Sequence, residues 1–244
     1  MANAFKPLGA ASVDRIVIMG PSHHVSFEGC AVTSASVFET PLGSLQVDTE
    51  TVKQLHSTGK FPYFPLHCDE AEHSIEMHLP MLQTVLGEEA CKLLKVLSIV
   101  VSKLTTEMEK EYAKLLAEFC DGERVRVCLS SDFCHWGPRF QYFNLPADAQ
   151  PGQMLSEQIE RLDRAGMQAI ATGDPMVFRE YLKLTKNTIC GQKPILIFME
   201  MSQLLGWGCT YELVSYDRSG KHVDPEDSTV SYVACHIRKS KAAK

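Results

Sequence analysis

Polar side chains suited to chemistry follow two apolar runs that the sequence predicts to be strands. His23 and His24 belong to GPSHH, which comes directly after the run RIVIMG. Asp132 and His135 belong to SSDFCHWG, which comes directly after the run RVRVCLS. Ligands of α/β proteins bind beyond the C-terminal ends of the strands. Both segments are therefore expected at one edge of the same sheet, where their side chains can share a pocket.

Asp132 and His135 are three residues apart, a spacing that places both side chains on one side of a turn. A carboxylate beside an imidazole orients the ring and favours its protonated form, which suits general acid–base work and the support of a metal ligand. The alternative is a loop-capping Asp132 next to a packed His135. His23 and His24 are adjacent, so their side chains diverge and at most one of them faces a given pocket. The alternative for this pair is that both lie at the surface.

A third segment, NTICG, contains Cys190 directly before a glycine, between two predicted helices. A cysteine at a helix boundary can be exposed, and a nearby helix N-terminus favours its thiolate. The alternative is a buried thiol that fills the core.

A fourth segment, EHSIEMHLP, begins with Glu72 and lies within a helix predicted over residues 70–86. Glu72 and Glu76 are four residues apart and would share one face of that helix, with His73 beside Glu76. The two carboxylates are expected either to form a wall of the pocket or to stabilise the helix dipole. The segment is not a His-Glu-x-x-His zinc motif, because its two histidines are five residues apart.

Strand and helix signals alternate along the chain, a pattern typical of α/β proteins. Strands are predicted over residues 15–20, 30–39, 92–101 and 124–130, and helices over residues 48–58, 70–86, 105–120, 153–172, 175–184 and 193–205. Residues 92–101 form a continuous apolar run, which needs cover on both faces as in a parallel sheet. Asp48 and Asp174 suit the N-caps of the helices that follow them, the second with Pro175 in its first turn.

These elements predict one α/β domain over residues 1–244, with a mainly parallel central sheet flanked by helices. Two further β runs, 209–216 and 228–237, predict a C-terminal antiparallel hairpin on the sheet edge. Residues 1–14 and 239–244 are expected to be tails.

The composition is that of a globular protein, with 45% hydrophobic and 22% charged residues. The net charge is −6 and no long basic run is present, which argues against nucleic acid as the main partner. The sequence contains neither a signal-peptide core nor a run of about 18 apolar residues, so we expect no secretion and no membrane insertion. Its nine cysteines are odd in number and include no Cys-x-x-Cys pair, which favours free thiols and a cytoplasmic location.

Taken together, the four segments resemble the Memo-like family, named for mediators of receptor-tyrosine-kinase-driven cell motility. The matching stretches are GPSHH, DEAEHSIEMHLP, SSDFCHWG and NTICG, in that order, followed by DSTVSYVA near the C-terminus. The resemblance extends roughly from Arg15 to Cys235. It implies a fold related to the class III extradiol dioxygenases, with a non-haem metal pocket at one end of the sheet.

The resemblance also implies roles for individual residues. His23 and Cys190 match metal-ligating positions of the family pocket, and Asp132 and His135 match its acid–base residues. His24 is expected to support the loop, and His24, Glu72 and Glu76 stay open as pocket-wall residues.

The family has a further strand upstream of GPSHH, with an Ala-Pro-His-Ala-Gly motif that supplies another histidine ligand. Residues 1–14 contain no histidine, so we expect a chain that is N-terminally shortened relative to the family. His23 and Cys190 alone would be few ligands for a metal that prefers three or four.

Three functions are compatible with these residues. The first is a metal-dependent redox protein that binds iron or copper, and if it is an enzyme it would be an oxidoreductase resembling the extradiol dioxygenases. The second is a non-catalytic adaptor that binds a phosphotyrosine peptide or a receptor-signalling protein through the remnant pocket. The third is nucleophilic hydrolysis by Cys190 with His135 and Asp132.

Overall fold

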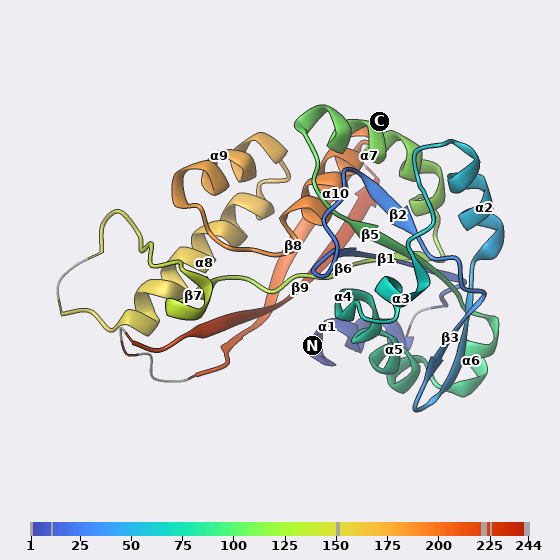
Figure 1. Ribbon diagram of the computed structural model, residues 1–244, viewed down its shortest axis with the longest axis horizontal. Helices are drawn as coiled ribbons and strands as arrows, with labels where there is room; N and C mark the ends of the chain where they lie inside the picture. The colour runs from blue at the N-terminus through green and yellow to red at the C-terminus, as the bar shows by residue number, and fades with distance from the viewer. Residues whose placement is uncertain (1, 11, 150–151, 221–223, 225, 242–244) are drawn as a thin grey trace. The chain divides into compact units, whose positions relative to one another are not determined.

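The computed structural model describes residues 2–10, 12–149, 152–220, 224 and 226–241 (Figure 1). Of the two expected tails, residues 1, 11 and 242–244 lie outside the described residues, whereas residues 2–10 are helical with Phe5 buried and residues 239–241 belong to a strand. The chain divides into two compact units. We call Ala2–Ser130 with Lys193–Leu205 the sheet unit, and Ser131–Gln192 with Gly206–Lys244 the hairpin unit. In the part of the chain that the structure describes, no helix is long and apolar enough to cross a membrane.

A six-stranded, mainly parallel sheet forms the centre of the sheet unit, as predicted. Its strand order is β3-β4-β5-β1-β6, and β2 pairs with β5 beside this path. β4, β5, β1 and β6 run parallel to one another, whereas β2 is antiparallel to β5 and β3 is antiparallel to β4. The strands are β1 (Arg15–Pro21), β2 (Cys30–Val32), β3 (Val37–Thr40), β4 (Gly43–Val47), β5 (Lys95–Val101) and β6 (Val125–Leu129).

The apolar sequence of β1 explains its central position. Ile16 and Ile18 point to one face, where they join a core cluster with residues of the flanking helices, including Phe5 and Leu82. Val17 and Met19, which alternate with them, are also fully buried. Strands covered on both faces read as continuous apolar runs, which is why the sequence predicted this strand well.

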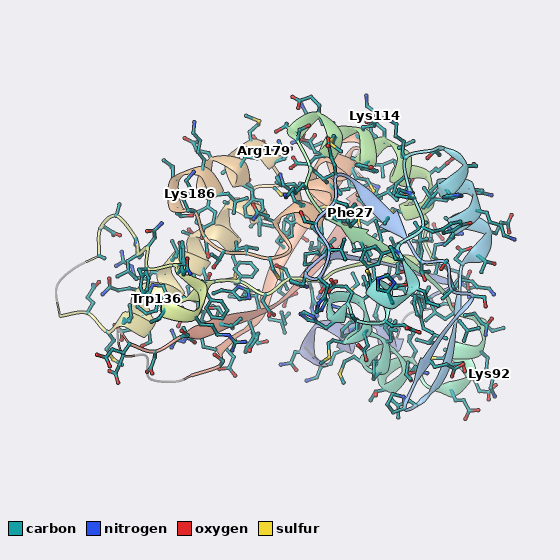
Figure 2. The ribbon with its side chains drawn as sticks, viewed as in Figure 1. Phe27, Lys92, Lys114, Trp136, Arg179 and Lys186 are labelled. Atoms are coloured by element: carbon teal, nitrogen blue, oxygen red, sulfur yellow. The ribbon has the colours of Figure 1, made fainter. Side chains whose placement is uncertain are left out.

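The helices of the sheet unit lie between and around these strands. They are α1 (Ala2–Phe5), η1 (Lys6–Ala10), α2 (Thr49–Ser57), α3 (Leu66–Asp69), α4 (His73–Glu76), α5 (Leu79–Leu86), α6 (Glu88–Leu93), α7 (Thr106–Cys120) and α10 (Gln192–Leu204). The predicted N-cap of α2 is confirmed, because the Asp48 carboxylate accepts a hydrogen bond from the N–H of Thr51 at 3.2 Å. Phe27 (labelled in Figure 2) packs inside this unit, its ring 5.8 Å from that of Phe64.

The helix predicted over residues 70–86 is wrong as a single element. The segment forms the short helix α4, a turn at Met77 and His78, and then α5 with Pro80 in its first turn. Proline cannot donate a hydrogen bond and clashes with a preceding helical turn, so it starts a new helix rather than continuing the old one. The strand predicted from residue 92 likewise begins only at Lys95, because α6 occupies the residues before it.

The hairpin unit contains a second, three-stranded antiparallel sheet in the order β7-β9-β8. The predicted hairpin is confirmed as β8 and β9, which lie side by side in Figure 1. Instead of joining the edge of the central sheet, as predicted, the described part of the hairpin forms a separate sheet, in which β9 pairs on its other side with the two-residue strand β7. The elements of this unit are β7 (His135–Trp136), η2 (Pro138–Phe140), α8 (Leu155–Ala171), α9 (Pro175–Thr185), β8 (Trp207–Arg218) and β9 (Thr229–Lys241).

Local signals account for the ends of the elements in this unit. The Asp174 carboxylate caps α9 by accepting the N–H of Met176 at 2.8 Å, with Pro175 in the first turn, as predicted.

Trp136 (labelled in Figure 2) is buried in the core of the hairpin unit together with Cys134 and Ile159. No disulfide is present among the described residues, which include all nine cysteines, in agreement with the expectation of thiols.

Candidate functional site

Three donor side chains converge in the sheet unit, where the loop after β1 meets the start of α4. His23 comes from the loop, Glu72 is the N-cap residue of α4, and His73 is its first residue. One potential ligand atom from each of the three residues lies within 4.8 Å of the other two. The arrangement is a compact set of two imidazoles and one carboxylate.

A close approach at Gly20 brings α4 to this loop. A Cβ atom on Gly20 would lie 2.6 Å from the Ser74 hydroxyl oxygen and 2.9 Å from the Ser74 Cβ, so only glycine fits here without a shift. The Ser74 hydroxyl donates a hydrogen bond to the carbonyl of Pro21 at 2.8 Å. The glycine of GPSHH therefore allows the first turn of α4 to contact the end of β1, and this contact places His73 beside His23.

The Glu72 carboxylate is fully buried and is held by several donors. Its Oε2 accepts the backbone N–H of His23 at 2.6 Å, and its Oε1 accepts the backbone N–H of Ser74 at 3.0 Å. Oε1 also lies 2.8 Å from Nδ1 of His23. Burial acts to raise the pKa of Glu72, but the hydrogen bonds from His23 and Ser74 outweigh it and lower the pKa to about 2. Glu72 is thus a carboxylate at neutral pH.

The two imidazoles lie above this carboxylate and are open to solvent. The side chains of His23 and His73 are 30% and 59% exposed, and their rings stack with centroids 4.4 Å apart at 16°. Nδ1 of His73 lies 3.7 Å from Oε1 of Glu72. Ligand atoms at about 2.0–2.2 Å from one metal are about 3.0–3.5 Å from one another, and the separations of 2.8 and 3.7 Å lie just below and just above this range. The donor set fits a transition metal, and its exposed side leaves room for a further ligand.

The two remaining residues of the predicted pocket wall behave differently. His24 is exposed, and its ring meets the edge of His73 at a centroid distance of 6.0 Å. Glu76 is exposed and does not share a face with the buried Glu72, because Glu72 precedes α4 in an extended conformation. The shared-face prediction depended on the single helix over residues 70–86 and is wrong for the same reason.

In the hairpin unit, the segments that carry Asp132 and Cys190 are paired. The backbone N–H of Asp132 donates to the Cys190 sulfur at 3.0 Å, and the N–H of Cys190 donates to the carbonyl of Asp132 at 3.3 Å. One residue further on each side, the N–H of Gly191 donates to the Ser131 hydroxyl at 3.0 Å. The structure therefore brings together the SSDFCHWG and NTICG segments, while the roles predicted for Asp132 and Cys190 stay predictions.

The ring of His135 is oriented by backbone carbonyls. Its Nδ1 lies 2.9 Å from the carbonyl of Phe133 and 3.1 Å from that of Thr188. A carbonyl oxygen only accepts, so Nδ1 carries the hydrogen in this geometry. The neighbouring Cys134 is fully buried, and burial raises the pKa of its thiol well above the ordinary value, as expected for a core cysteine.

His73 is the residue that the sequence analysis missed as a donor. The helix expected over residues 70–86 paired it with Glu76 instead of Glu72. One signal could have helped to locate it: Pro80, which limits the preceding helix. Glutamate is not among the preferred N-cap residues, so the start of α4 at Glu72 has no such signal. With Glu72 assigned as an N-cap residue, His73 falls next to a fixed carboxylate.

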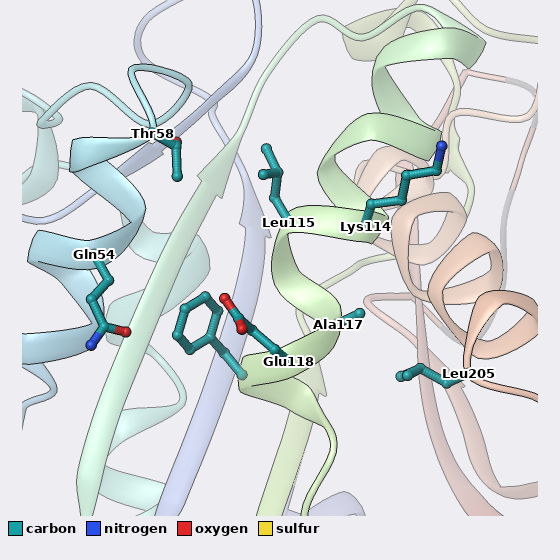
Figure 3. A pocket seen from close by; sticks show the side chains of 8 residues that line it. Gln54, Thr58, Lys114, Leu115, Ala117, Glu118 and Leu205 are labelled. Carbon is teal, nitrogen blue, oxygen red and sulfur yellow. The ribbon is translucent and has the colours of Figure 1, made fainter.

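A groove of about 650 Å³ lies elsewhere in the sheet unit. Figure 3 shows Gln54 and Thr58 on the α2 side facing Leu115 and Glu118 on α7. None of the predicted site residues lines it. The lining residues are Gln54, Thr58, Lys114, Leu115, Ala117, Glu118, Phe119 and Leu205.

Comparisons with known proteins agree with the resemblance of the motifs. A family model described as Memo-like protein matches residues 1–236. The Protein memo-1 homolog of Caenorhabditis elegans is 38% identical over 237 residues, which are 96% of this chain and 66% of the relative. Protein MEMO1 of Homo sapiens is 36% identical over 236 residues, 96% of this chain and 78% of that protein. The chain thus spans about two thirds of the length of the worm relative.

A solved structure shares the fold at low sequence identity. The crystal structure of the uncharacterized protein JW3007 from Escherichia coli K12 matches with a TM-score of 0.53 and 11% identity. The match covers 94% of this chain and 91% of that one. At this identity the likeness concerns the fold alone.

Proposed function

The chain belongs to the Memo-like family, and we propose that it binds one divalent iron ion through His23, Glu72 and His73 and uses it for redox chemistry. The observation that carries the proposal is the convergence of the three donor groups within 4.8 Å of one another. The resemblance implied a metal pocket that includes His23. Glu72 and His73 supply the additional ligands that His23 and Cys190 alone would lack.

The donor types favour iron over copper. Two imidazoles and one carboxylate with open positions are the ligand set of non-haem Fe(II) oxygenases. Copper(I) prefers soft thiolate ligands, so the copper alternative depends on Cys190 rather than on this group. Zinc accepts the same set of two histidines and one glutamate and is the closest competitor in binding.

Iron bound here would supply one-electron chemistry and an open coordination position for a small ligand or substrate. The protein's own contribution is to hold the donors in place. The N–H groups of His23 and Ser74 fix the Glu72 carboxylate in its ionised form, ready to bind a cation. The exposed faces of His23 and His73 admit a substrate from solvent. The acid–base roles of Asp132 and His135, and a ligand role for Cys190, stay predictions.

The electrostatics of the group favour a cation over a phosphate. His23 Nδ1 lies 2.8 Å from the buried Glu72 carboxylate. A phosphotyrosine peptide that bound to this histidine would bring its negative charge close to that carboxylate, and the two like charges would repel each other. The adaptor alternative therefore gains no support from this geometry. A role in motility signalling, which the family name implies, would in this proposal depend on the metal.

Iron loading of matched variants tests the proposal. The purified protein is stripped with a chelator, loaded anaerobically with Fe(II), desalted, and assayed for bound iron by elemental analysis. We expect about one iron per chain, and at least a tenfold weaker affinity in Glu72→Gln and in His73→Ala, since each removes one ligand. Glu76→Gln is the control, because Glu76 is an exposed acid on the same helix.

Equal iron affinity in the wild-type protein and Glu72→Gln would contradict the proposal. The proposal would also be contradicted if Cys190→Ala bound no iron while His73→Ala bound a full equivalent. The metal would then bind at the thiol of Cys190. Phosphotyrosine-peptide binding that persists after chelation, in a protein that does not bind iron, would support the adaptor alternative.

A further inference from the structure

Asp163 is a fully buried carboxylate on α8 that accepts hydrogen bonds from three separate segments of the hairpin unit. Its Oδ1 accepts the backbone N–H of Cys134 at 3.1 Å and the side-chain amide of Asn187 at 3.0 Å. Its Oδ2 accepts the hydroxyl of Tyr216 at 2.9 Å. A buried carboxylate is costly unless it is hydrogen-bonded, and here three donors surround it.

One of these donors lies next to the candidate residue His135, and another lies next to its hydrogen-bond partner Thr188. Cys134 directly precedes His135, and Asn187 directly precedes Thr188. The backbone N–H of His135 donates to the Thr188 hydroxyl at 2.7 Å, and that hydroxyl donates to the carbonyl of His135 at 3.0 Å. Asp163 thus accepts a hydrogen bond from each of the two segments, next to the point where they are hydrogen-bonded to each other.

The network ends at the ring of His135. We propose that Asp163 is a positioning residue that selects the Nδ1–H tautomer of His135, by holding the Cys134 and Asn187 segments that present two carbonyls to the ring. The carbonyls of Phe133 and Thr188 accept from Nδ1, and a neutral ring with its hydrogen on Nδ1 has a basic lone pair on Nε2. Asp163 contacts no ring atom and acts only through the backbone.

The same network reaches further into the unit through Asn187. Its amide also donates to the Tyr181 hydroxyl at 2.7 Å, which in turn donates to the carbonyl of Leu162 at 2.8 Å. Burial raises the pKa of Asp163, and the hydrogen bonds from Asn187, Tyr216 and the Cys134 N–H oppose this rise. The carboxylate is therefore stabilised by the groups that it positions.

The proposal deepens the acid–base role that the family resemblance implies for His135, independently of the proposed iron site, and its test needs no metal. The protein is labelled with ¹⁵N-histidine, and a two-dimensional NMR spectrum reports which ring nitrogen of each histidine carries hydrogen. His135→Gln assigns the signal. In the wild-type protein we expect His135 with hydrogen on Nδ1. In Asp163→Asn we expect the Nδ1–H to Nε2–H ratio to fall about tenfold, the effect of one hydrogen bond of typical strength.

Asp48→Asn is the matched control. Asp48 is a buried aspartate of the sheet unit that accepts hydrogen bonds from Arg15 at 2.6 Å and from Thr51. Its substitution should lower the melting temperature and leave the His135 signal unchanged. A tautomer change of equal size in both variants would show that general loss of stability, and not positioning by Asp163, moves the ring.

Tyr216→Phe keeps the test decisive if Asp163→Asn does not fold. It removes one of the three donors and is expected to shift the tautomer ratio in the same direction by a smaller factor. An unchanged His135 signal in the folded variants would overturn the proposal. Iron loading measured on the same samples reports the proposed function separately, so a wild-type protein without iron would refute that function and leave the tautomer result standing.

Discussion

Replacing Glu72 with glutamine in the metal-free protein changes one charge at the centre of the candidate site. Glutamine keeps the shape of the side chain but presents an amide group to donors that need an acceptor. The N–H groups of His23 and Ser74 both point at this carboxylate, at 2.6 and 3.0 Å. At least one of them would face another donor in the variant. We therefore expect a lower free energy of unfolding with a characteristic pH dependence.

The size of the effect follows from the pKa of Glu72, which falls from an ordinary 4.5 to about 2 in the folded protein. Each pKa unit is worth about 1.36 kcal/mol, so the ionised carboxylate contributes about 3 kcal/mol to stability. Because the folded-state pKa is the lower one, this contribution is complete above pH 4.5 and is lost as the pH falls through 2. Near pH 3 about half of it is left.

Urea unfolding of both proteins with chelator present, at pH 7 and at pH 3, measures this contribution. The wild-type protein should be about 3 kcal/mol more stable than Glu72→Gln at pH 7, and the difference should shrink to roughly half at pH 3. Glu76→Gln, at an exposed position of the same helix, should stay within about 0.5 kcal/mol of the wild-type protein. A difference between wild-type protein and Glu72→Gln that is independent of pH, or below about 1 kcal/mol at pH 7, would refute the assigned hydrogen bonds.

Two further predictions follow from burial and close contact. Gly20→Ala should lower the free energy of unfolding by about 1–3 kcal/mol and weaken iron binding, because its Cβ would collide with Ser74; unchanged unfolding and loading would show that α4 does not depend on this contact. Cys134 should resist iodoacetamide at pH 8 in the folded protein, since it is fully buried and its pKa is raised by burial. Rapid labelling of Cys134, measured by mass spectrometry, would contradict its place in the core.

The elements that the sequence predicted best are those whose signals are local. The apolar run of β1 and the capped helices after Asp48 and Asp174 were located closely, because burial on both faces and N-cap chemistry depend on neighbouring residues. The hairpin of β8 and β9 was also predicted, but its separate sheet was not. The two-residue strand β7 is too short to show a periodic pattern, and its partner β9 lies far along the chain.

The candidate site was only partly visible in the sequence for a related reason. His23 was identified from its position after a strand, and it does lie in the group of three donors. Glu72 was considered as a wall residue and His73 was missed, because their roles depend on where α4 begins. That start is set by the contact of Ser74 with Gly20, which joins two segments about fifty residues apart. No spacing rule within either segment contains this contact.

The measurement that tests the account most directly is anomalous diffraction at the iron absorption edge from crystals of the iron-loaded protein. If iron binds through His23, Glu72 and His73, one strong peak is expected at about 2.0–2.2 Å from an imidazole nitrogen of each histidine and from a carboxylate oxygen of Glu72. A peak bonded to the sulfur of Cys190 without Glu72 and His73, or no peak from a fully loaded crystal, would contradict it.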